Sequence, residues 1–290
     1  MRDLICYKTM PVWNAGTLPE VFQQRHNTKE GAWAKLKVLQ GTLTFAFLTD
    51  DDEILETAVF TPENPPPLVQ PQQWHRIAGF SPDMECQLAF YCLPEDFYHL
   101  KHDLTRTHSE VIEAAKYLPP GKALDLGCGS GRNALYLNLL GFDVTAYDKN
   151  PLGIDTLNGI IATEQLHNIR TGIYDINEQL IDGRYDFILS TVVMMFLQAD
   201  KIERVIGNIQ QSTNDGGLNL IVAAMSTDDY PCPLPFPFTF GTGELKNYYR
   251  DWEIIKYNED MGQLHKTDAD GNRIKLRFAT LLAKKRPAGD

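Results

Sequence analysis

The chain has 290 residues and a mass of 32.8 kDa, which is too long for one small domain and sufficient for two. Its 43% hydrophobic and 22% charged residues are typical of a folded globular protein and exclude a mostly disordered chain. The formal net charge of −11 argues against sequence-independent binding of nucleic acid, which requires a basic surface, so an anionic substrate would need a local group of basic side chains.

The cysteines and the first residues indicate the compartment. The five cysteines are scattered without the spacing of a zinc site or a disulfide framework, which favours free thiols in a reducing environment. Arg2, Asp3 and Lys8 interrupt the start of the chain, so we expect no signal peptide. No apolar run approaches the ~18 residues of a membrane span. The sequence therefore predicts a cytoplasmic protein that contacts neither membrane nor nucleic acid.

Residues 1–94 predict an all-β domain. Short runs rich in Val, Phe, Trp and Thr alternate with clusters of Gly, Pro and Asp, which is typical of strands separated by turns. The prolines between residues 62 and 67 predict an extended connector rather than a helix. We expect a sandwich or small barrel. Its predicted strands are 33–39, 42–48, 56–60, 69–77 and 86–93.

Residues 95–290 predict a second domain, of the α/β class. Strand-like and helical segments alternate, which favours a doubly wound parallel sheet with helices on both faces. The final two strands, 252–257 and 274–283, are joined by a polar turn, so we expect an antiparallel last strand. A capping box at Thr107 and Glu110 predicts the start of the first helix. The other predicted strands are 123–126, 144–147, 169–174, 186–193 and 218–224, and the other predicted helices are 132–140, one capped by Asn150, and one that buries Ile202, Val205, Ile206 and Ile209.

A glycine-rich segment, residues 123–131, lies where a predicted strand turns into a helix. Gly127 and Gly129 allow the backbone to approach a ligand, and the amides at the start of the following helix point toward it. Arg132 replaces the third glycine of the dinucleotide fingerprint, which makes a pyrophosphate contact less favourable. The segment therefore predicts a ligand site that differs from a dinucleotide site.

Acidic residues stand at the ends of successive predicted strands: Asp125, Asp148 and Asp175. At this edge of a doubly wound sheet an acid binds a ribose diol, while a carboxylate near the loop attracts an ammonium or sulfonium and repels a phosphate chain. Any one of these residues alone could equally cap a helix. Together they favour S-adenosylmethionine as the ligand over a dinucleotide.

These features resemble motif I and the seven-stranded sheet of class I S-adenosylmethionine-dependent methyltransferases. Over about residues 95–285 the sequence is more specifically similar to the tellurite-resistance methyltransferase family (TehB), and residues 1–94 resemble the cupin-like β domain that some long members carry in front. The segments that carry the similarity are 104–111, 185–193, 220–225, 229–232 and 267–278.

The resemblance implies a Rossmann-like methyltransferase that uses S-adenosylmethionine to methylate tellurite and selenium oxyanions, conferring tellurite resistance. It implies that Tyr98, Arg106 and His108 fold over the methionine end of the cofactor; for Arg106 and His108 a solvated helix start is the alternative. The whole cofactor site implied by the resemblance comprises Tyr98, Arg106, His108, Asp125, Gly127, Gly129, Asp148, Lys149, Asp175, Ile176 and Thr191.

A small anionic substrate such as tellurite or selenite needs basic side chains, and His265, Lys266 and Arg273 surround the predicted final turn. We expect His265 and Arg273 to contact the substrate in preference to Lys266, which lacks the bidentate fork of arginine; solvent-exposed turn residues are the alternative. The segment 226–243 is long and rich in Pro and Phe, which favours an active-site lid over a packed surface loop or an interface.

Other functions stay open at this stage: a methyltransferase for a thiol or another small soft nucleophile, a non-catalytic S-adenosylmethionine sensor, and a nicotinamide oxidoreductase. His75, between Trp74 and Arg76, resembles the second cupin motif, but Lys35 and Lys37 stand where the first motif would place histidines, so we expect no metal site. The oligomeric state stays open, a homo-oligomer included.

Overall fold

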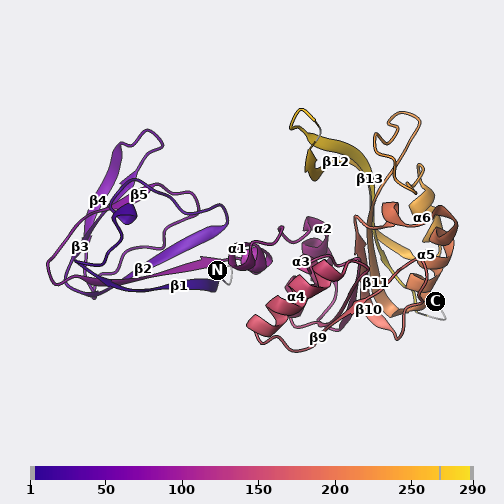
Figure 1. Ribbon diagram of the computed structural model, residues 1–290, viewed down its shortest axis with the longest axis horizontal. Helices are drawn as coiled ribbons and strands as arrows, with labels where there is room; N and C mark the ends of the chain where they lie inside the picture. Colours follow the sequence, from indigo (N-terminus) through magenta and orange to yellow (C-terminus); the bar gives the residue numbers. More distant parts are fainter. Residues whose placement is uncertain (1–3, 268, 288–290) are drawn as a thin grey trace. The chain divides into compact units, whose positions relative to one another are not determined.

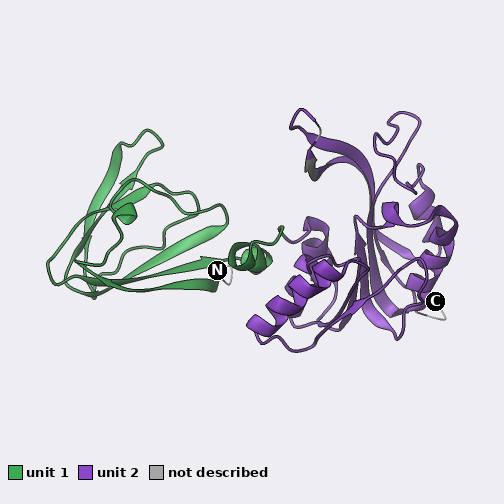
Figure 2. Cartoon of the chain, viewed as in Figure 1, with its two compact units in different colours: residues 1–106 green, residues 107–290 purple. Residues whose placement is uncertain are grey.

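The computed structural model describes residues 4–267 and 269–287, without the side chains of His265 and Lys266. The chain forms two compact units, Met1–Arg106 and Thr107–Asp290 (Figures 1 and 2). Each unit has its own hydrophobic core. The predicted boundary between residues 94 and 95 stays a prediction, since the division by contacts assigns the following helix to the first unit.

In its described residues, unit 1 folds into two three-stranded antiparallel sheets that share one core. The first sheet has the order β1-β6-β2 (Ile5–Asn14, Glu85–Cys92, Ala32–Gln40) and the second the order β4-β3-β5 (Ile54–Phe60, Leu43–Leu48, His75–Phe80). Side chains from both sheets, including Trp13, Leu36 and Phe45, fill the space between them. The predicted all-β domain is confirmed. Three short helices complete the unit: η1 (Glu20–Phe22), η2 (Pro94–Asp96) and α1 (Phe97–His102).

Two predictions for unit 1 were incomplete. Strand β1 was not predicted, because it carries Pro11 and its pairing with β6 is irregular, both of which are tolerated at the edge of a sheet. The predicted strand 69–77 is two pieces: Val69 forms an isolated bridge with Ala34, and β5 begins only at His75. Pro71, which lacks a backbone donor, separates the two pieces.

Unit 2 contains a seven-stranded sheet with the order β12-β13-β11-β10-β7-β8-β9. Strands β7 to β11 are parallel to one another, and β13 pairs antiparallel with both β11 and β12, as expected from the sequence. The predicted doubly wound sheet with an antiparallel last strand is confirmed. The strands are β7 (Lys122–Leu126), β8 (Asp143–Asp148), β9 (Ile169–Ile173), β10 (Tyr185–Thr191), β11 (Thr213–Ala224), β12 (Glu253–Thr267) and β13 (Arg273–Lys284).

Helices connect these strands. Helix α5 buries the predicted apolar face, and α4 begins with Pro151 after Asn150, whose Oδ1 accepts from the backbone N–H of Leu152 at 3.1 Å. The predicted capping box at Thr107 is wrong in its first residue: His108 is the N-cap of α2, and its Nδ1 accepts from the N–H of Glu110. The helices are α2 (Ser109–Ala114), η3 (Ala115–Tyr117), α3 (Arg132–Leu139), α4 (Pro151–Thr163), η4 (Met194–Phe196), η5 (Ala199–Lys201), α5 (Ile202–Gln211) and α6 (Glu244–Tyr248).

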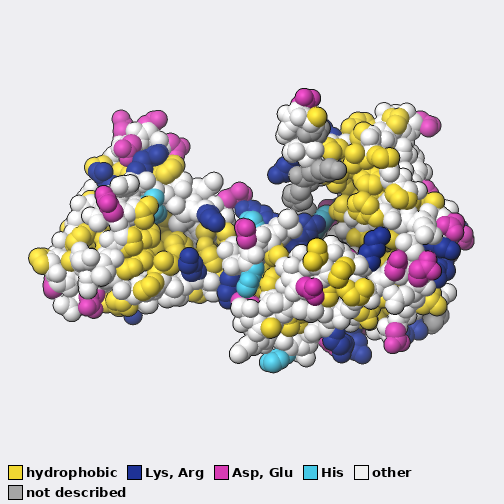
Figure 3. Space-filling model, viewed as in Figure 1, with side chains coloured by type: hydrophobic (Ala, Val, Ile, Leu, Met, Phe, Trp, Pro, Cys, Tyr) yellow, Lys and Arg dark blue, Asp and Glu magenta, His cyan; other side chains and the backbone are white. Residues whose placement is uncertain are grey.

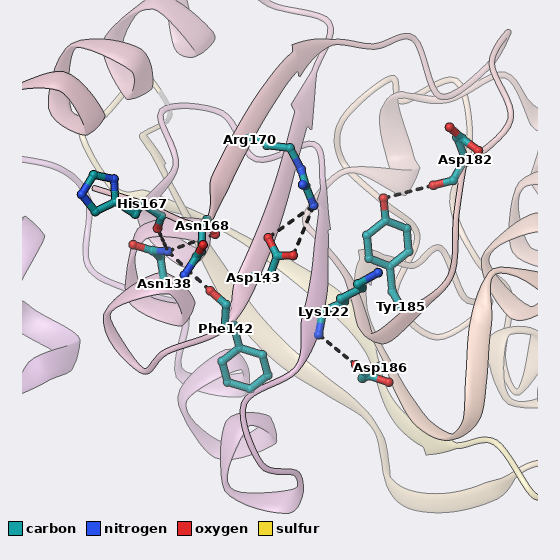
Figure 4. A network of polar contacts seen from close by, with 10 residues as sticks. All are labelled: Lys122, Asn138, Phe142, Asp143, His167, Asn168, Arg170, Asp182, Tyr185 and Asp186. Carbon is teal, nitrogen blue, oxygen red and sulfur yellow. Dashed lines mark hydrogen bonds and ion pairs between the residues drawn. The ribbon is translucent and has the colours of Figure 1, made fainter. Parts of the chain in front are cut away.

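Polar contacts hold the amino edge of this sheet together (Figure 4). Asp186, near the start of β10, accepts from the backbone N–H of Lys122 at 2.8 Å, and Asp143, at the start of β8, pairs with Arg170 at 3.3 Å. These contacts fix the strand starts.

The hairpin β12–β13 is longer than predicted. The polar stretch after Tyr257 continues as strand to Thr267, because its residues pair in register with β13. Gly262 lies against the ring of Phe278, and a Cβ there would come within 2.8 Å of that ring. The register carries the hairpin tip past the end of β11, at the carboxyl edge of the parallel strands (Figure 1). None of the helices in residues 4–267 and 269–287 has the length and hydropathy to span a lipid bilayer.

Candidate functional site

The glycine-rich loop lies where the strand order across the sheet reverses. From β7 the sheet continues through β8 and β9 on one side and through β10 and β11 on the other. In open α/β sheets, ligands bind outside the carboxyl ends of the strands at such a switch point. The loop 127–131 follows β7 there, while Asp148 ends β8 and Asp175 follows β9. The sheet therefore brings the predicted acidic residues to one edge.

Asp148 holds this loop by direct hydrogen bonds. The backbone N–H of Gly129 donates to Asp148 Oδ2 at 2.8 Å, and the N–H of Asn150 donates to Oδ1 at 2.8 Å. Each carboxylate oxygen keeps a second lone pair, and the side chain is half-buried, so Asp148 is able to accept from a ligand hydroxyl as well. Cys128 within the loop is buried, and burial, together with Asp125 and Asp148, raises the pKa of its thiol.

The glycines of the loop serve different purposes. A Cβ at Gly127 would come within 2.3 Å of Val193, so this glycine permits close packing. A Cβ at Gly129 would have no heavy atom within 4 Å, which shows that this backbone borders open space. Both residues have positive φ, 80° and 55°, which disfavours other side chains. Gly129 therefore presents bare backbone where a ligand can approach.

Asp125 is a buried carboxylate near the end of β7. Asp125 is 1% exposed, and in the described part of the chain neither of its carboxylate oxygens accepts a hydrogen bond. Burial raises the pKa of Asp125 to about 7; the Arg132 guanidinium opposes this shift, the Asp148 carboxylate adds to it, and the nearby backbone N–H of Ala134 opposes it weakly. Buried polar groups in native proteins are normally satisfied, so the unfilled oxygens favour a bound partner with N–H donors or positive charge.

Asn133, which the sequence analysis did not single out, connects two predicted site residues. Its Oδ1 accepts from the backbone N–H of His108, and its Nδ2 donates to Thr191 Oγ1, each at 3.0 Å. Asn133 is only 4% exposed. It thereby ties the starts of α2 and α3 to the end of β10. The only signal in the sequence was its position at the helix start, directly after Arg132.

The predicted residues near β8 and β9 occupy the same edge. Asp175 Oδ1 accepts from the backbone N–H of Asn177 at 2.9 Å, so this acid also shapes a turn. Ile176 is half-buried and packs against the core, whereas Lys149 is exposed. Tyr147, which precedes Asp148, stacks its ring on that of Tyr174 at 4.8 Å between centroids. Each of the two acids, Asp148 and Asp175, therefore directly follows one of these stacked tyrosines in the sequence.

Two predicted cofactor residues, Tyr98 and Arg106, belong to unit 1. Tyr98 is buried in α1. Arg106 forms ion pairs with Glu30, at 3.3 Å, and with Asp96, at 3.8 Å. The structure gives these two residues a structural role within unit 1, and their contact with the cofactor stays a prediction.

The predicted substrate residues belong to the β12–β13 hairpin. Arg273 is exposed, begins β13 and pairs in register with Thr267. The backbone of His265 and Lys266 continues β12, but their side chains lie outside the described residues. The hairpin thus places its tip at the carboxyl edge of the sheet, and contact of these three residues with a substrate stays a prediction.

The segment 226–243 lies between β11 and α6 and packs against this hairpin. Arg277 of β13 pairs with Asp229 at 2.9 Å, and Cys232 and Phe236 belong to an apolar cluster with Leu276. Figure 3 shows hydrophobic side chains gathered over this part of unit 2. The segment is therefore anchored on the hairpin, and its movement as a lid stays a prediction.

Comparison with known proteins gives the family. The family described as tellurite resistance protein TehB matches residues 90–282, and the TehB-like domain matches residues 8–88. The chain belongs to the TehB family. It is 55% identical over 285 residues to the "Probable S-adenosyl-L-methionine-dependent methyltransferase TehB" of Haemophilus influenzae (strain 10810), covering 98% of this chain and 99% of that protein.

Two further similar proteins were found. The chain is 45% identical to "Hemagglutinin 1" of Eikenella corrodens, over 82% of this chain and 79% of that protein. The crystal structure of TehB from Haemophilus influenzae superimposes with a TM-score of 0.95 and 55% identity, covering 98% of this chain and 99% of that one. The predicted family and fold class are confirmed, and with the family the predicted S-adenosylmethionine cofactor.

The residues of the TehB site fit this cofactor chemically. The unfilled Asp125 carboxylate suits a cationic ligand, the bare backbone at Gly129 leaves room for it, and Asp148 keeps lone pairs for hydroxyl donors. S-Adenosylmethionine combines an ammonium, a sulfonium and a ribose diol, which are the groups that such a site requires.

Proposed function

We propose that this chain is a methyltransferase that moves a methyl group from S-adenosylmethionine to tellurite and related selenium oxyanions, and so confers resistance to tellurite. The observation that carries the methyltransferase part is the buried Asp125 carboxylate, with both oxygens unfilled, beside the open backbone of Gly129. The oxyanion part is supported by membership of the family described as tellurite resistance protein TehB.

The methyl transfer depends on the alignment of the acceptor with the donor's methyl group more than on removal of a proton from the acceptor. Tellurite carries its own lone pair on tellurium, so the new carbon–tellurium bond forms as the carbon–sulfur bond of the sulfonium breaks, in line, without a general base. The protein contributes by orienting both partners and excluding water. Asp125, Asp148 and the Gly129 backbone would hold the donor, and the bound donor supplies the methyl group.

The substrate would be held at the hairpin. The net charge of −11 repels anions at long range, so positive charge must be concentrated where an oxyanion binds. Arg273, exposed at the carboxyl edge, is suited to this role, and we assign the same role to His265 and Lys266.

The test is a labelled transfer assay. The protein is incubated with methyl-labelled S-adenosylmethionine and tellurite, and the labelled methyl–tellurium oxyanion is separated from the donor and measured in solution, with heat-inactivated protein as the control. We expect label on tellurium only with active protein and tellurite. Its absence, together with transfer to selenite or to a thiol in parallel reactions, would reject tellurite but not the methyltransferase. Cofactor binding without transfer to any acceptor would favour a sensor.

A second acceptor class has a specific observation in its favour. The surface beside the hairpin carries partly buried apolar side chains, among them Cys232, Leu234 and Phe236. Such a surface suits an uncharged soft nucleophile such as an alkyl or aryl thiol. Competition between tellurite and a thiol in the same assay ranks the two acceptors.

A further inference from the structure

Unit 1 contains a cavity of about 90 Å³ that the proposed methyl transfer does not use. Its walls come from both sheets and are mainly apolar, with Trp13, Leu36 and Phe45 among them. Two histidines, His26 and His75, also line it. A cavity of this size holds several water molecules or one small ring, and apolar walls favour the ring.

The two histidines have defined tautomers. His26 Nδ1 is 2.9 Å from the carbonyl oxygen of Gln24, and His75 Nδ1 is 2.7 Å from that of Gln73. A carbonyl oxygen only accepts, so each Nδ1 carries the hydrogen and each Nε2 carries a lone pair. Within the described part of the chain, no hydrogen bond is found for either Nε2.

The rings are also fixed in place and uncharged. They lie 4.2 Å apart between centroids, joined by the backbone bridge between His26 and His75. Phe45 stacks on His75, and Phe22 packs edge-on against His26. Burial lowers the pKa of both side chains, that of His75 to about 4. At neutral pH the cavity therefore offers two oriented acceptors among apolar walls.

We propose that this cavity binds a small, uncharged, largely apolar molecule that donates one hydrogen bond to Nε2 of His26 or His75. A phenol has this chemistry, because its ring suits the apolar walls and its hydroxyl suits the lone pair. An anion would find no hydrogen on either Nε2, and a cation would lose its hydration among apolar side chains. In the described residues no three ligating side chains come together, which argues against a metal ion.

The test compares phenol with toluene, which replaces the hydroxyl with a methyl group of similar size. Both are titrated into the full chain by calorimetry, and the histidine ring nitrogens are followed by long-range ¹H–¹⁵N spectra. We expect phenol to bind about fivefold more tightly than toluene, the effect of one hydrogen bond, and to move an Nε2 resonance of His26 or His75. Equal affinities, no binding, or binding that leaves both Nε2 resonances unmoved would overturn the proposal.

Variants locate the acceptor. Phenylalanine keeps an aromatic ring but has no lone pair, so the preference for phenol should disappear in the double variant His26→Phe/His75→Phe. The exposed His167, in unit 2, provides the control His167→Phe, which should keep the preference. A preference that survives in the double variant would contradict the assignment. If that variant does not fold, the nitrogen spectra of the unaltered chain decide.

Discussion

Asp125 is a carboxylic acid at a buried position where its ionisation is energetically unfavourable. Burial raises its pKa to about 7, so its ionised form is unfavourable in the folded protein without a partner. We therefore expect Asp125→Asn to leave the melting temperature unchanged or raised, while weakening S-adenosylmethionine binding by about 1–3 kcal/mol, the effect of a lost charged hydrogen bond. Calorimetric titration and thermal unfolding measure the two effects.

The matched control for this variant is Asp143→Asn at the amino edge of the neighbouring strand, where the carboxylate pairs with Arg170. It should leave cofactor affinity unchanged. A lower melting temperature with unchanged affinity in Asp125→Asn would mean that this acid serves the fold and not the ligand.

Gly127 and Gly129 should respond differently to the same substitution. Gly127→Ala places a methyl group within 2.3 Å of Val193, so we expect a loss of stability of more than about 1 kcal/mol, relieved in part by Val193→Ala. Gly129→Ala meets no atom within 4 Å, so its cost should be confined to the strain of a positive φ, while its methyl group enters the ligand space. Denaturation and cofactor titration together separate the two; unchanged affinity in Gly129→Ala would contradict the assigned ligand position.

His75 should make unit 1 sensitive to acid. Its pKa is lowered to about 4 from an ordinary value of 6.5, first by burial, so between these pH values the unfolded chain binds a proton that the folded chain does not. The resulting stability is fully present above pH 6.5 and is lost as the pH falls toward 4, by on the order of 3 kcal/mol in total. Between pH 7 and pH 5, His75→Phe should lose less stability than the unaltered chain in denaturant unfolding. Equal losses would show that His75 does not titrate in this way.

At the scale of elements, the proposed substrate residues lie on the β12–β13 hairpin, whereas Asp125, Asp148 and Gly129 of the proposed cofactor site lie on other elements. Arg273 lies on the hairpin and not on the glycine loop, so Arg273→Ala should reduce turnover of an anionic acceptor at least about fivefold while cofactor affinity stays the same. Arg170→Ala, at the amino edge, is the charge-matched control and should change neither. Steady-state kinetics with tellurite provide the measurement. A parallel loss of cofactor affinity would contradict this division.

The elements also show what a sequence can reveal. Strands with regular apolar patterns, such as β3 and β7, and the capped helix α4 were predicted because their signals are local. Edge strand β1 was missed because pairing with β6 outweighs the presence of Pro11, and β12 was predicted too short because pairing with β13 outweighs its polar residues. The residue pattern within a strand does not show which other strand it will pair with.

The absence of long-range contacts from local patterns also explains which site residues were predicted and which were missed. The acids at strand ends were found because chain position alone implies the edge that they share. Asn133 was missed because its importance comes from contacts with His108 and Thr191, which only the fold brings together. His26 was missed likewise: His75 resembled a motif, but its neighbour comes from a distant segment.

At the scale of the molecule, the two units have separate cores, so they should unfold in separate transitions. S-Adenosylmethionine at a hundred times its dissociation constant stabilises the state that binds it by about 2.7 kcal/mol. We expect differential scanning calorimetry to show two transitions, of which this ligand shifts that of unit 2; a smaller shift of unit 1 would report the predicted cofactor contacts of Tyr98 and Arg106. One cooperative transition would contradict the independence of the two cores.

The burial of Cys128 has a consequence for the proposed reaction with tellurium and selenium oxyanions. Thiolates attack tellurite and selenite and are oxidised by them, and the reactive form of a cysteine is its exposed thiolate. Cys128 lies inside the cofactor loop, yet it is shielded from solvent and its neighbouring acids disfavour the thiolate. The loop is thereby protected from oxidation by the oxyanion that the protein is proposed to methylate.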